Sequence, residues 1–309
     1  MTGIGLSLGF LSLTTNIVIF RLAFFLIGLS AGIYLPSAVA TISSLFEPHL
    51  WGRAFSVHEL APNLAFLSAP LYIALLLPHL SWQRLVQIPI GFLLAAVVLY
   101  SIVGRDVRKK PSKPDLRLYR ELFYQRDFQL MVILFSMGIT STLGIYSILP
   151  TYLVSVHGFT EHQANLLVSA SRIPTLGAAL ASGFFADYFG HRRAIGLVLF
   201  CSGFMTILLA QDRHLLHLAI WLQPVLAVCF FPAAFALLSR IGPAESRGIT
   251  VSLTMPLAFV TGGGIMPAII TRMADYGLFS RAIVIVGFLI IAGSFLVILI
   301  DDQQADILR

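Results

Sequence analysis

Long uncharged stretches limit what this chain can fold into more than any other feature. Hydrophobic residues make up 58% of its 309 residues, and charged residues make up only 11%. A soluble protein of this length needs far more charge to cover its surface. The apolar stretches are continuous rather than alternating, and most reach the ~20 residues that a helix needs to cross a bilayer. Because lipid offers the backbone no hydrogen-bond partner, we expect an all-α polytopic membrane protein.

Ten membrane spans are predicted from the apolar stretches. They cover residues 1–15, 17–45, 54–77, 84–103, 128–153, 163–186, 194–211, 214–239, 248–271 and 281–300. Most connections are short, but residues 104–127 form a polar stretch that we expect to be a cytoplasmic linker loop. The predicted organisation is therefore an N-terminal bundle at 1–103, a C-terminal six-helix bundle at 128–301 and a cytoplasmic tail at 302–309.

Lysine and arginine predict the orientation of these spans. If residue 1 is cytoplasmic, fourteen of the 20 basic residues fall on the inner side and four fall on the outer side. Cytoplasmic loops carry such an excess of positive charge. We therefore expect a multi-pass protein of the inner (cytoplasmic) membrane with both termini in the cytoplasm. The basic linker can also contact anionic lipid headgroups, or it can be a merely solvated segment.

A short pattern recurs in the two parts of the chain. Pro-x-Ala-x-Ala-x-x-Ser begins at Pro36 and again at Pro232. Each copy is followed by a polar hinge and then by a similar helix, which contains Pro62 in one copy and Pro256 in the other. A helix pair repeated in the same orientation suggests a transporter built of two halves. The spans at 128–186 have no counterpart in the first part, so we expect the chain to lack two helices at its N-terminus.

The turn after the sixth span contains the fullest local motif. It reads Gly183-Phe-Phe-Ala-Asp187-Tyr-Phe-Gly190-His-Arg192-Arg193. Gly190 would supply a backbone shape that a side chain forbids. Asp187 would lie near another helix N-terminus, where its charge is favoured, and could pair with Arg192 or Arg193.

This turn resembles the signature loop of the major facilitator superfamily. Two departures from the family pattern are Tyr188 and His191, which stand where the family usually has basic residues. The resemblance extends over essentially the whole chain, from the third family helix to the twelfth. It implies two six-helix bundles that rock around a central path, with a cytoplasmic gate formed by the motif residues Gly183, Asp187, Gly190, Arg192 and Arg193. It does not fix a substrate.

Arg172 is a cation that we place within the sixth span, between serines and Pro174. Charged side chains are rare at such depth because burying them costs at least ~2.5–3.5 kcal/mol. One interpretation is an anchor for an anionic substrate, since a guanidinium grips carboxylate or phosphate through two parallel hydrogen bonds. The other is a structural arginine bonded to carbonyls of a facing helix. Both interpretations are open at this point.

Glu59 and His58 lie together in the third span, about 10 Å from its inner end. A buried glutamate can carry a proton, and an adjacent histidine could relay it, so one hypothesis is proton coupling. The alternative is that both residues bond helix ends at the cytoplasmic mouth. Their shallow depth slightly favours this alternative. Because Glu59 and Arg172 differ in depth by about 10 Å, we do not expect a direct ion pair.

Uncharged polar residues complete the candidate substrate site. Thr140 and Tyr146 in the fifth span, with Asn63 and Gln223 elsewhere, could hydrogen-bond a ligand or only their own helix backbone. The sequence contains no phosphate-binding Gly-x-x-x-x-Gly-Lys-Ser/Thr motif, no cluster of metal ligands and no nucleophile elbow. We therefore expect no cofactor, no bound metal, no enzymatic activity and no nucleic-acid partner.

The predicted function is secondary active transport of a small molecule across the cytoplasmic membrane. The substrate would be an organic anion if Arg172 faces the central cavity, and protons are the expected coupling ion. The alternative is a transporter-like membrane protein that does not transport, either a sensor or an inactive remnant. Uptake into vesicles that is abolished by Arg172→Ala would favour transport, whereas ligand binding without flux would favour the alternative.

Overall fold

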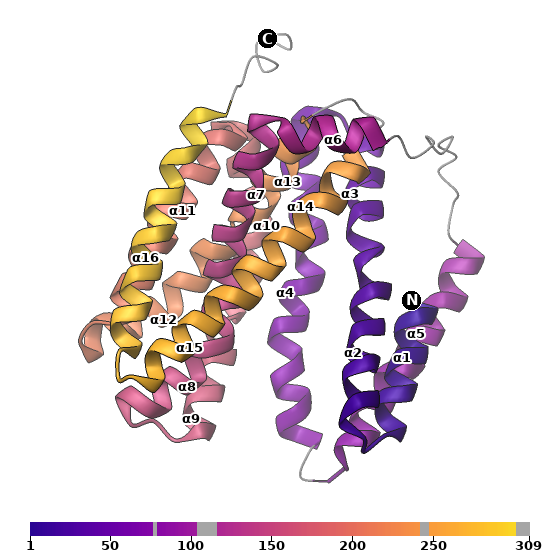
Figure 1. Cartoon of the computed structure of the whole chain (residues 1–309), viewed down its shortest axis with the longest axis vertical. Coiled ribbons are helices and arrows are strands. Elements are labelled where there is room, and N and C mark those ends of the chain that lie inside the picture. Colours follow the sequence, from indigo (N-terminus) through magenta and orange to yellow (C-terminus); the bar gives the residue numbers. More distant parts are fainter. Residues whose placement is uncertain (77–78, 104–115, 242–246, 301–309) are drawn as a thin grey trace.

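The computed structural model describes residues 1–76, 79–103, 116–241 and 247–300, and this part of the chain is helical without strands (Figure 1). The helices are α1 Thr2–Leu13, α2 Ile17–Gly32, α3 Tyr34–Leu45, α4 Trp51–Leu76, α5 Trp82–Val103, α6 Leu116–Tyr124, α7 Arg126–Ile139, α8 Ile145–His157, α9 Glu161–Ala170, α10 Ile173–Phe189, α11 His191–Leu208, α12 Arg213–Val228, α13 Phe230–Leu238, α14 Arg247–Ala258, α15 Met266–Asp275 and α16 Phe279–Leu296. Short 3₁₀ turns lie at Pro48–Leu50 (η1) and Val297–Leu299 (η5).

All ten predicted spans are present as helices, and seven are long and apolar enough to cross a membrane by length and composition. Several of these spans are not single α-helices. π-helical turns at Thr140–Gly144 (η2) and Phe259–Ile265 (η4) interrupt the spans α7–α8 and α14–α15. The sixth span breaks between α9 and α10, two residues before Pro174. Proline lacks a backbone N–H and disfavours helical geometry in the preceding residue, which accounts for this break.

The prediction that residues 104–127 form a loop is only partly tested. Residues 104–115 lie outside the described part of the chain, as do residues 301–309 of the predicted tail. Residues 116–124 form the helix α6, which runs across one end of the other helices (Figure 1). Leu122 on this helix is 2% exposed, so α6 buries an apolar side chain against the helices below it. That burial explains why a segment read as a polar loop is helical.

The helices form two groups that follow the chain order. In the first, α1 packs against α2 and α5; in the second, α11 packs against α12, α13 and α16. The apolar faces of α2–α3 and α5 are almost entirely exposed in the described structure. In a membrane such faces contact lipid tails, which are as apolar as the side chains themselves. The chain is thus a multi-pass membrane protein.

The sequence repeat has a structural counterpart. The helix before each copy ends three residues ahead of the proline, at Ile33 between α2 and α3 and at Cys229 between α12 and α13. The helix after each copy is α4 or α14. Across the two groups, α4 packs against α13 and α3 packs against α14. The helix that contains one copy therefore packs against the helix that follows the other copy, and this holds in both directions. A twofold relation between the copies produces such reciprocal pairs.

The two groups meet mainly at one end, which we call the Asp187 end because it contains the turn between α10 and α11 that carries Asp187. There α4 packs against α10 and α13, and the rings of Phe55 and Phe235 lie 5.7 Å apart. Both rings are at most 1% exposed. At the opposite end, Figure 1 shows α2 and the end of α4 apart from α8 and α15. The observed conformation is therefore tightly packed at the Asp187 end.

Gln223 of α12 forms hydrogen bonds to two other helical elements of the second group, η2 and α11. Its amide nitrogen donates to the carbonyl oxygen of Ser141 at 2.7 Å and to the hydroxyls of Ser141 and Thr206 at 3.1 and 3.4 Å. The side chain is 2% exposed. These bonds connect α12 to the π-helical turn η2 and to α11, where the irregular backbone needs additional partners.

We predict that Gln223→Leu lowers the free energy of unfolding by about 0.5–2 kcal/mol, because it removes interhelical hydrogen bonds while keeping the volume. Thermal unfolding of the detergent-solubilised protein measures this loss. The matched control is Gln211→Leu, since Gln211 is exposed just beyond α11 and its amide donates to the Ile207 carbonyl oxygen of that preceding helix. Equal midpoints for the two variants would contradict the structural role of Gln223.

Candidate functional site

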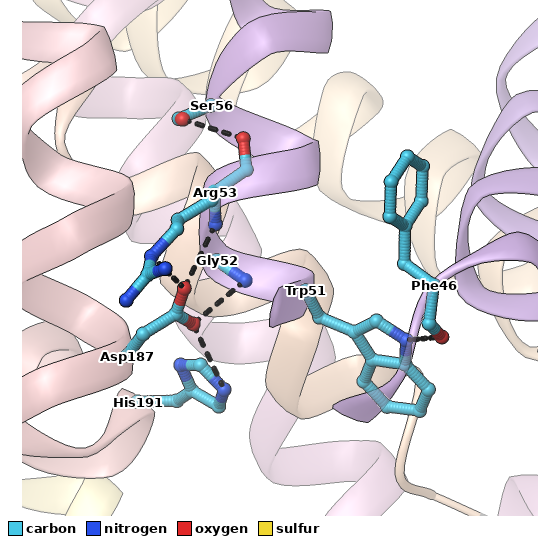
Figure 2. Close-up of polar contacts among 7 residues, drawn as sticks. All are labelled: Phe46, Trp51, Gly52, Arg53, Ser56, Asp187 and His191. Atoms are coloured by element: carbon cyan, nitrogen blue, oxygen red, sulfur yellow. Dashed lines mark hydrogen bonds and ion pairs between the residues drawn. The ribbon is translucent and has the colours of Figure 1, made fainter. Parts of the chain in front are cut away.

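A sharp turn joins α10 to α11 and presents Asp187. Gly190 lies between the two helices with φ +89°, a region that favours glycine because it has no Cβ. This is the backbone shape that the sequence predicts at Gly190, whereas its role in a gate stays a prediction. The turn brings the last part of α10, including Asp187, against the beginning of α4 in the other group of helices (Figure 2).

The carboxylate of Asp187 caps the N-terminus of α4. Its Oδ1 accepts the backbone N–H of Gly52 at 2.9 Å, and its Oδ2 accepts that of Arg53 at 3.1 Å. The Arg53 Nε lies 3.4 Å from Oδ2, and the Asp187 side chain is 3% exposed. The first N–H groups of a helix lack partners within it and carry partial positive charge, so a buried carboxylate is stabilised there. The predicted position of Asp187 near another helix N-terminus is confirmed.

This capping interaction depends on a close approach of two helix backbones. A Cβ placed on Gly183 of α10 would lie 2.6 Å from the Gly52 carbonyl oxygen of α4, and a Cβ on Gly52 would lie 2.8 Å from the Gly183 carbonyl oxygen. Only glycine fits at both positions without a shift of the helices. The guanidinium of Arg53 then lies over the Phe184 ring, 4.9 Å from its centre. We call Asp187 with Gly52, Arg53 and Gly183 the Asp187 clasp.

The predicted pairing of Asp187 with Arg192 or Arg193 is wrong. The structure pairs Asp187 with Arg53, and the turn directs Arg192 away, toward the end of α16. There the Arg192 Nε donates to the Val297 carbonyl oxygen at 2.9 Å, and its Nη2 donates to that of Ile298. Helix C-termini carry unpaired carbonyls and partial negative charge, which accounts for the preference.

Arg172 lies at the break between α9 and α10, where the two groups of helices meet. It is 4% exposed. Its guanidinium carbon lies 4.3 Å from the ring centre of Tyr146 and 5.7 Å from that of Phe66. Within the described residues its Nε has no hydrogen-bond partner. Since Phe66 belongs to α4 and Tyr146 to α8, the cation is held between the groups by aromatic faces.

Tyr146 also joins the two groups directly. Its hydroxyl donates to the Phe66 carbonyl oxygen at 3.3 Å, and the two rings lie 5.4 Å apart. The structure thus brings together two predicted site residues, Arg172 and Tyr146, with Phe66, which the sequence analysis did not select. Phe66 lies four residues after Pro62, in the helix that follows the first copy of the sequence repeat, and that location was the available signal.

Glu59 and His58 form a hydrogen-bonded pair on α4. The distance between His58 Nδ1 and Glu59 Oε1 is 3.2 Å, and the His58 Nε2 lies 3.3 Å from the Tyr34 hydroxyl of α3. Glu59 is 6% exposed. Its carbonyl oxygen accepts the side-chain amide of Asn63 at 2.7 Å. Tyr34 is a further partner that the sequence analysis did not identify.

The remaining candidates lie inside the second group of helices. Thr140 is fully buried, and its hydroxyl donates to the Ser136 carbonyl oxygen at 2.7 Å. The Gln223 amide nitrogen is bonded to Ser141 and Thr206, as described above. Neither side chain is brought into contact with Arg172 by the described hydrogen bonds. Among the described residues, no group of three or more His, Cys, Asp or Glu side chains is arranged to hold a metal ion.

Comparison with known proteins identifies relatives of this architecture. The family model described as Major Facilitator Superfamily matches residues 1–162 and 130–306. A comparison with curated protein sequences gives no match. Many solved structures share the fold. One is a human organic anion transporter, with TM-score 0.72 and 15% identity over 96% of this chain and 75% of that chain.

Two further similar structures come from bacteria. The Escherichia coli fucose:proton symporter matches with TM-score 0.73 and 14% identity, covering 97% of this chain and 84% of that chain. A bacterial homologue of the iron transporter ferroportin, solved in an outward-facing state, matches with TM-score 0.67 and 17% identity over 91% of this chain and 72% of that chain. At these identities the likeness concerns the fold.

We predict that Gly183→Ala separates α4 from α10, because the added Cβ would collide with the Gly52 carbonyl oxygen. Spin labels at Ser44 and Tyr188 are exposed near the ends of α3 and α10, so their distance reports how far the two groups of helices move apart at this end. The labels are introduced in a background in which both native cysteines are replaced. The distance distribution should shift to longer values. Gly177→Ala on the same helix is the control, since a Cβ there meets nothing within 4 Å. Identical distributions in both variants would rule out the glycine contact as a constraint.

Proposed function

Since the chain belongs to the major facilitator superfamily, we propose that it is a secondary active transporter that moves a small organic anion across the cytoplasmic membrane, driven by protons. Its fold is that of transporters in this family. The substrate class, the coupling ion and the membrane are the parts of this proposal that experiments must test.

The observation that carries the substrate class is the state of Arg172. The guanidinium of an arginine remains charged in proteins. Burying this charge without a carboxylate partner is costly in a membrane protein. The structure gives Arg172 two aromatic faces, and its Nε has no partner within the described residues. Cation–π contacts offset part of the cost of burial but do not neutralise the charge. An organic anion that reaches this position would supply both the charge and the missing acceptor.

The position of Arg172 also suits alternating access. It contacts Phe66 of one group of helices and Tyr146 of the other, so an anion bound there would interact with both. The Asp187 clasp holds the groups together at one end, while α2 and the end of α4 lie apart from α8 and α15 at the other (Figure 1). Rocking about the centre would break the clasp and open the Asp187 end.

We assign the Asp187 end to the cytoplasm. Arg53, Arg192, Arg193 and Arg240 lie at helix ends on this side, and Arg84, Arg213, Arg272 and Arg281 lie at helix ends on the opposite side. Arg120 of α6 and Arg126 at the start of α7 add to the first set. Positive charge is enriched on the cytoplasmic side of membrane proteins, which supports this orientation. The observed conformation would then be closed to the cytoplasm.

Glu59 is the proposed proton carrier, with His58 and Tyr34 as its relay. A buried carboxyl that changes its protonation on one side of the closed contact can link proton movement to the conformational cycle. The hydrogen bonds from Tyr34 to His58 and from His58 to Glu59 form a continuous path toward an exposed tyrosine. Asn63, which bonds the Glu59 carbonyl, would hold this part of α4 in place.

We predict that Arg172→Lys weakens binding of the anionic substrate by about tenfold or more, because a lysine cannot form two parallel hydrogen bonds. Thermal-shift titrations with acetate, benzoate, succinate and citrate, with glucose as a neutral comparison, identify the ligand. Arg281→Lys at the exposed start of α16 is the control. Stabilisation by glucose alone, or by anions equally in both variants, would refute the anion proposal. Ligand binding without uptake into proteoliposomes would instead indicate a non-transporting protein.

We predict that Glu59→Gln makes uptake insensitive to an imposed pH gradient, because glutamine keeps the shape of the side chain but cannot carry a proton. Uptake of the anion found above is measured in proteoliposomes with and without the gradient. Glu161→Gln, at the exposed N-terminus of α9, should leave the response intact. An unchanged response in Glu59→Gln would exclude this residue as the proton carrier.

A further inference from the structure

A cavity of about 890 Å3 lies at the Asp187 end, next to the clasp and far along the helices from Arg172. The first group of helices contributes Pro48 and His49 of η1 to its wall. The second group contributes the turn between α10 and α11, the end of α13 and the turn η5. A molecule in this cavity would therefore contact both groups of helices. The proposed transport path at Arg172 does not use it.

The wall of this cavity is strongly basic. Arg192 and Arg193 from the start of α11 and Arg240 from just beyond α13 all line it. They add to the positive end of α11, an 18-residue helix whose N-terminus has no side-chain cap and no acidic residue in its first turn. Cations at a helix N-terminus are normally unfavourable, because they repel the partial charge of the unpaired N–H groups. An anion beside this N-terminus would relieve that repulsion.

A second observation points to a ligand at the same place. His191, the first residue of α11, lines the cavity and is only 5% exposed. Its Nδ1 is buried and has no hydrogen-bond partner within the described residues. A buried nitrogen without a partner is costly, so a bound acceptor or donor at this position would be stabilising.

Two acidic groups that the structure describes near this cavity, Asp187 and Glu47, are already engaged. Asp187 also lines the cavity, but its two oxygens accept the N–H groups of Gly52 and Arg53, and its Oδ1 lies 4.0 Å from the His191 Nε2. His49 is paired with the exposed Glu47 at 3.2 Å. Arg192 is fixed by its bonds to the carbonyls of Val297 and Ile298, so its guanidinium is held in one orientation at the wall. Asp187 is thus paired with Arg53 and the start of α4 rather than with Arg192.

We propose that this cavity binds a phosphate group through Arg192, Arg193, Arg240 and the N-terminus of α11. The same chemistry is available from a soluble phosphate compound and from the headgroup of an anionic phospholipid. Guanidinium groups and free helix N–H groups are the usual phosphate ligands in proteins. Because both groups of helices contribute to the wall, the bound phosphate stabilises the closed Asp187 end. This consequence for gating rests on the proposed function, whereas the binding site does not.

The test measures binding directly and needs no transport. Thermal midpoints of the full chain in detergent are titrated with inorganic phosphate, with sodium chloride keeping the ionic strength constant. In parallel, midpoints are compared in nanodiscs of phosphatidylcholine with and without phosphatidylglycerol. The variant is Arg193→Gln, whose side chain is exposed and therefore not required for folding. Arg240→Gln is the second variant, and Arg213→Gln, at the opposite end, is the control.

The proposal expects stabilisation of the wild type and of Arg213→Gln by one of the two probes, and an apparent Kd about tenfold weaker in Arg193→Gln and Arg240→Gln. Stabilisation by inorganic phosphate in detergent identifies a soluble phosphate compound as the source. Stabilisation only by phosphatidylglycerol identifies a lipid headgroup. Absence of both effects, or equal effects in all the variants, would overturn the site. Because the readout is binding, this result is independent of whether the chain transports anions.

Discussion

The contact between the Asp187 carboxylate and the N-terminus of α4 is the interaction on which the observed arrangement of the two helix groups depends. It places a buried charge against two unpaired N–H groups and Arg53, and these bonds to a charged acceptor contribute about 1.5–3 kcal/mol each. The interaction is possible because Gly52 and Gly183 let two helix backbones approach closely. Its strength is suited to a contact that must hold one conformation and still open, since a few kcal/mol separate such states.

Polar side chains within the helices are of two kinds: those whose hydrogen bonds are made within the protein, and those that lack a partner. The second kind indicates where a ligand can bind. Gln223, Thr140 and Asn63 are buried with their donors bonded to protein oxygens, so they stabilise the helices around them. Arg172 is different, because a full charge is buried against rings without an acceptor for its Nε in the described structure. An unsatisfied group is expensive in a membrane protein and is retained where a ligand or a conformational change completes it. The cavity beside the Asp187 clasp also contains such a group, the His191 Nδ1, which is buried without a hydrogen-bond partner in the described structure.

Much of the fold could be predicted from the sequence because membrane insertion is governed by local composition. The ten spans, the turn at Gly190 and the repeat around Pro36 and Pro232 all follow from residues that are close together in the chain. The errors have physical causes. The helix α6 was missed because its buried Leu122 gains stability from tertiary packing, and the pairing of Asp187 with Arg192 was wrong because Arg192 finds the unpaired carbonyls at the end of α16.

The sequence by itself determined which segments lie in the membrane, where the chain turns and which residues carry charge into the apolar region. Only the tertiary structure decided the partners of those charges. Gly52 and Asp187 are 135 residues apart in the chain, and Arg172 meets Phe66 across the boundary between the two helix groups. Hydrophobicity and turn chemistry act over a few neighbouring residues, whereas the neighbour of a buried charge depends on how distant helices pack. That packing is fixed by shape and by close glycine contacts, which no local pattern specifies.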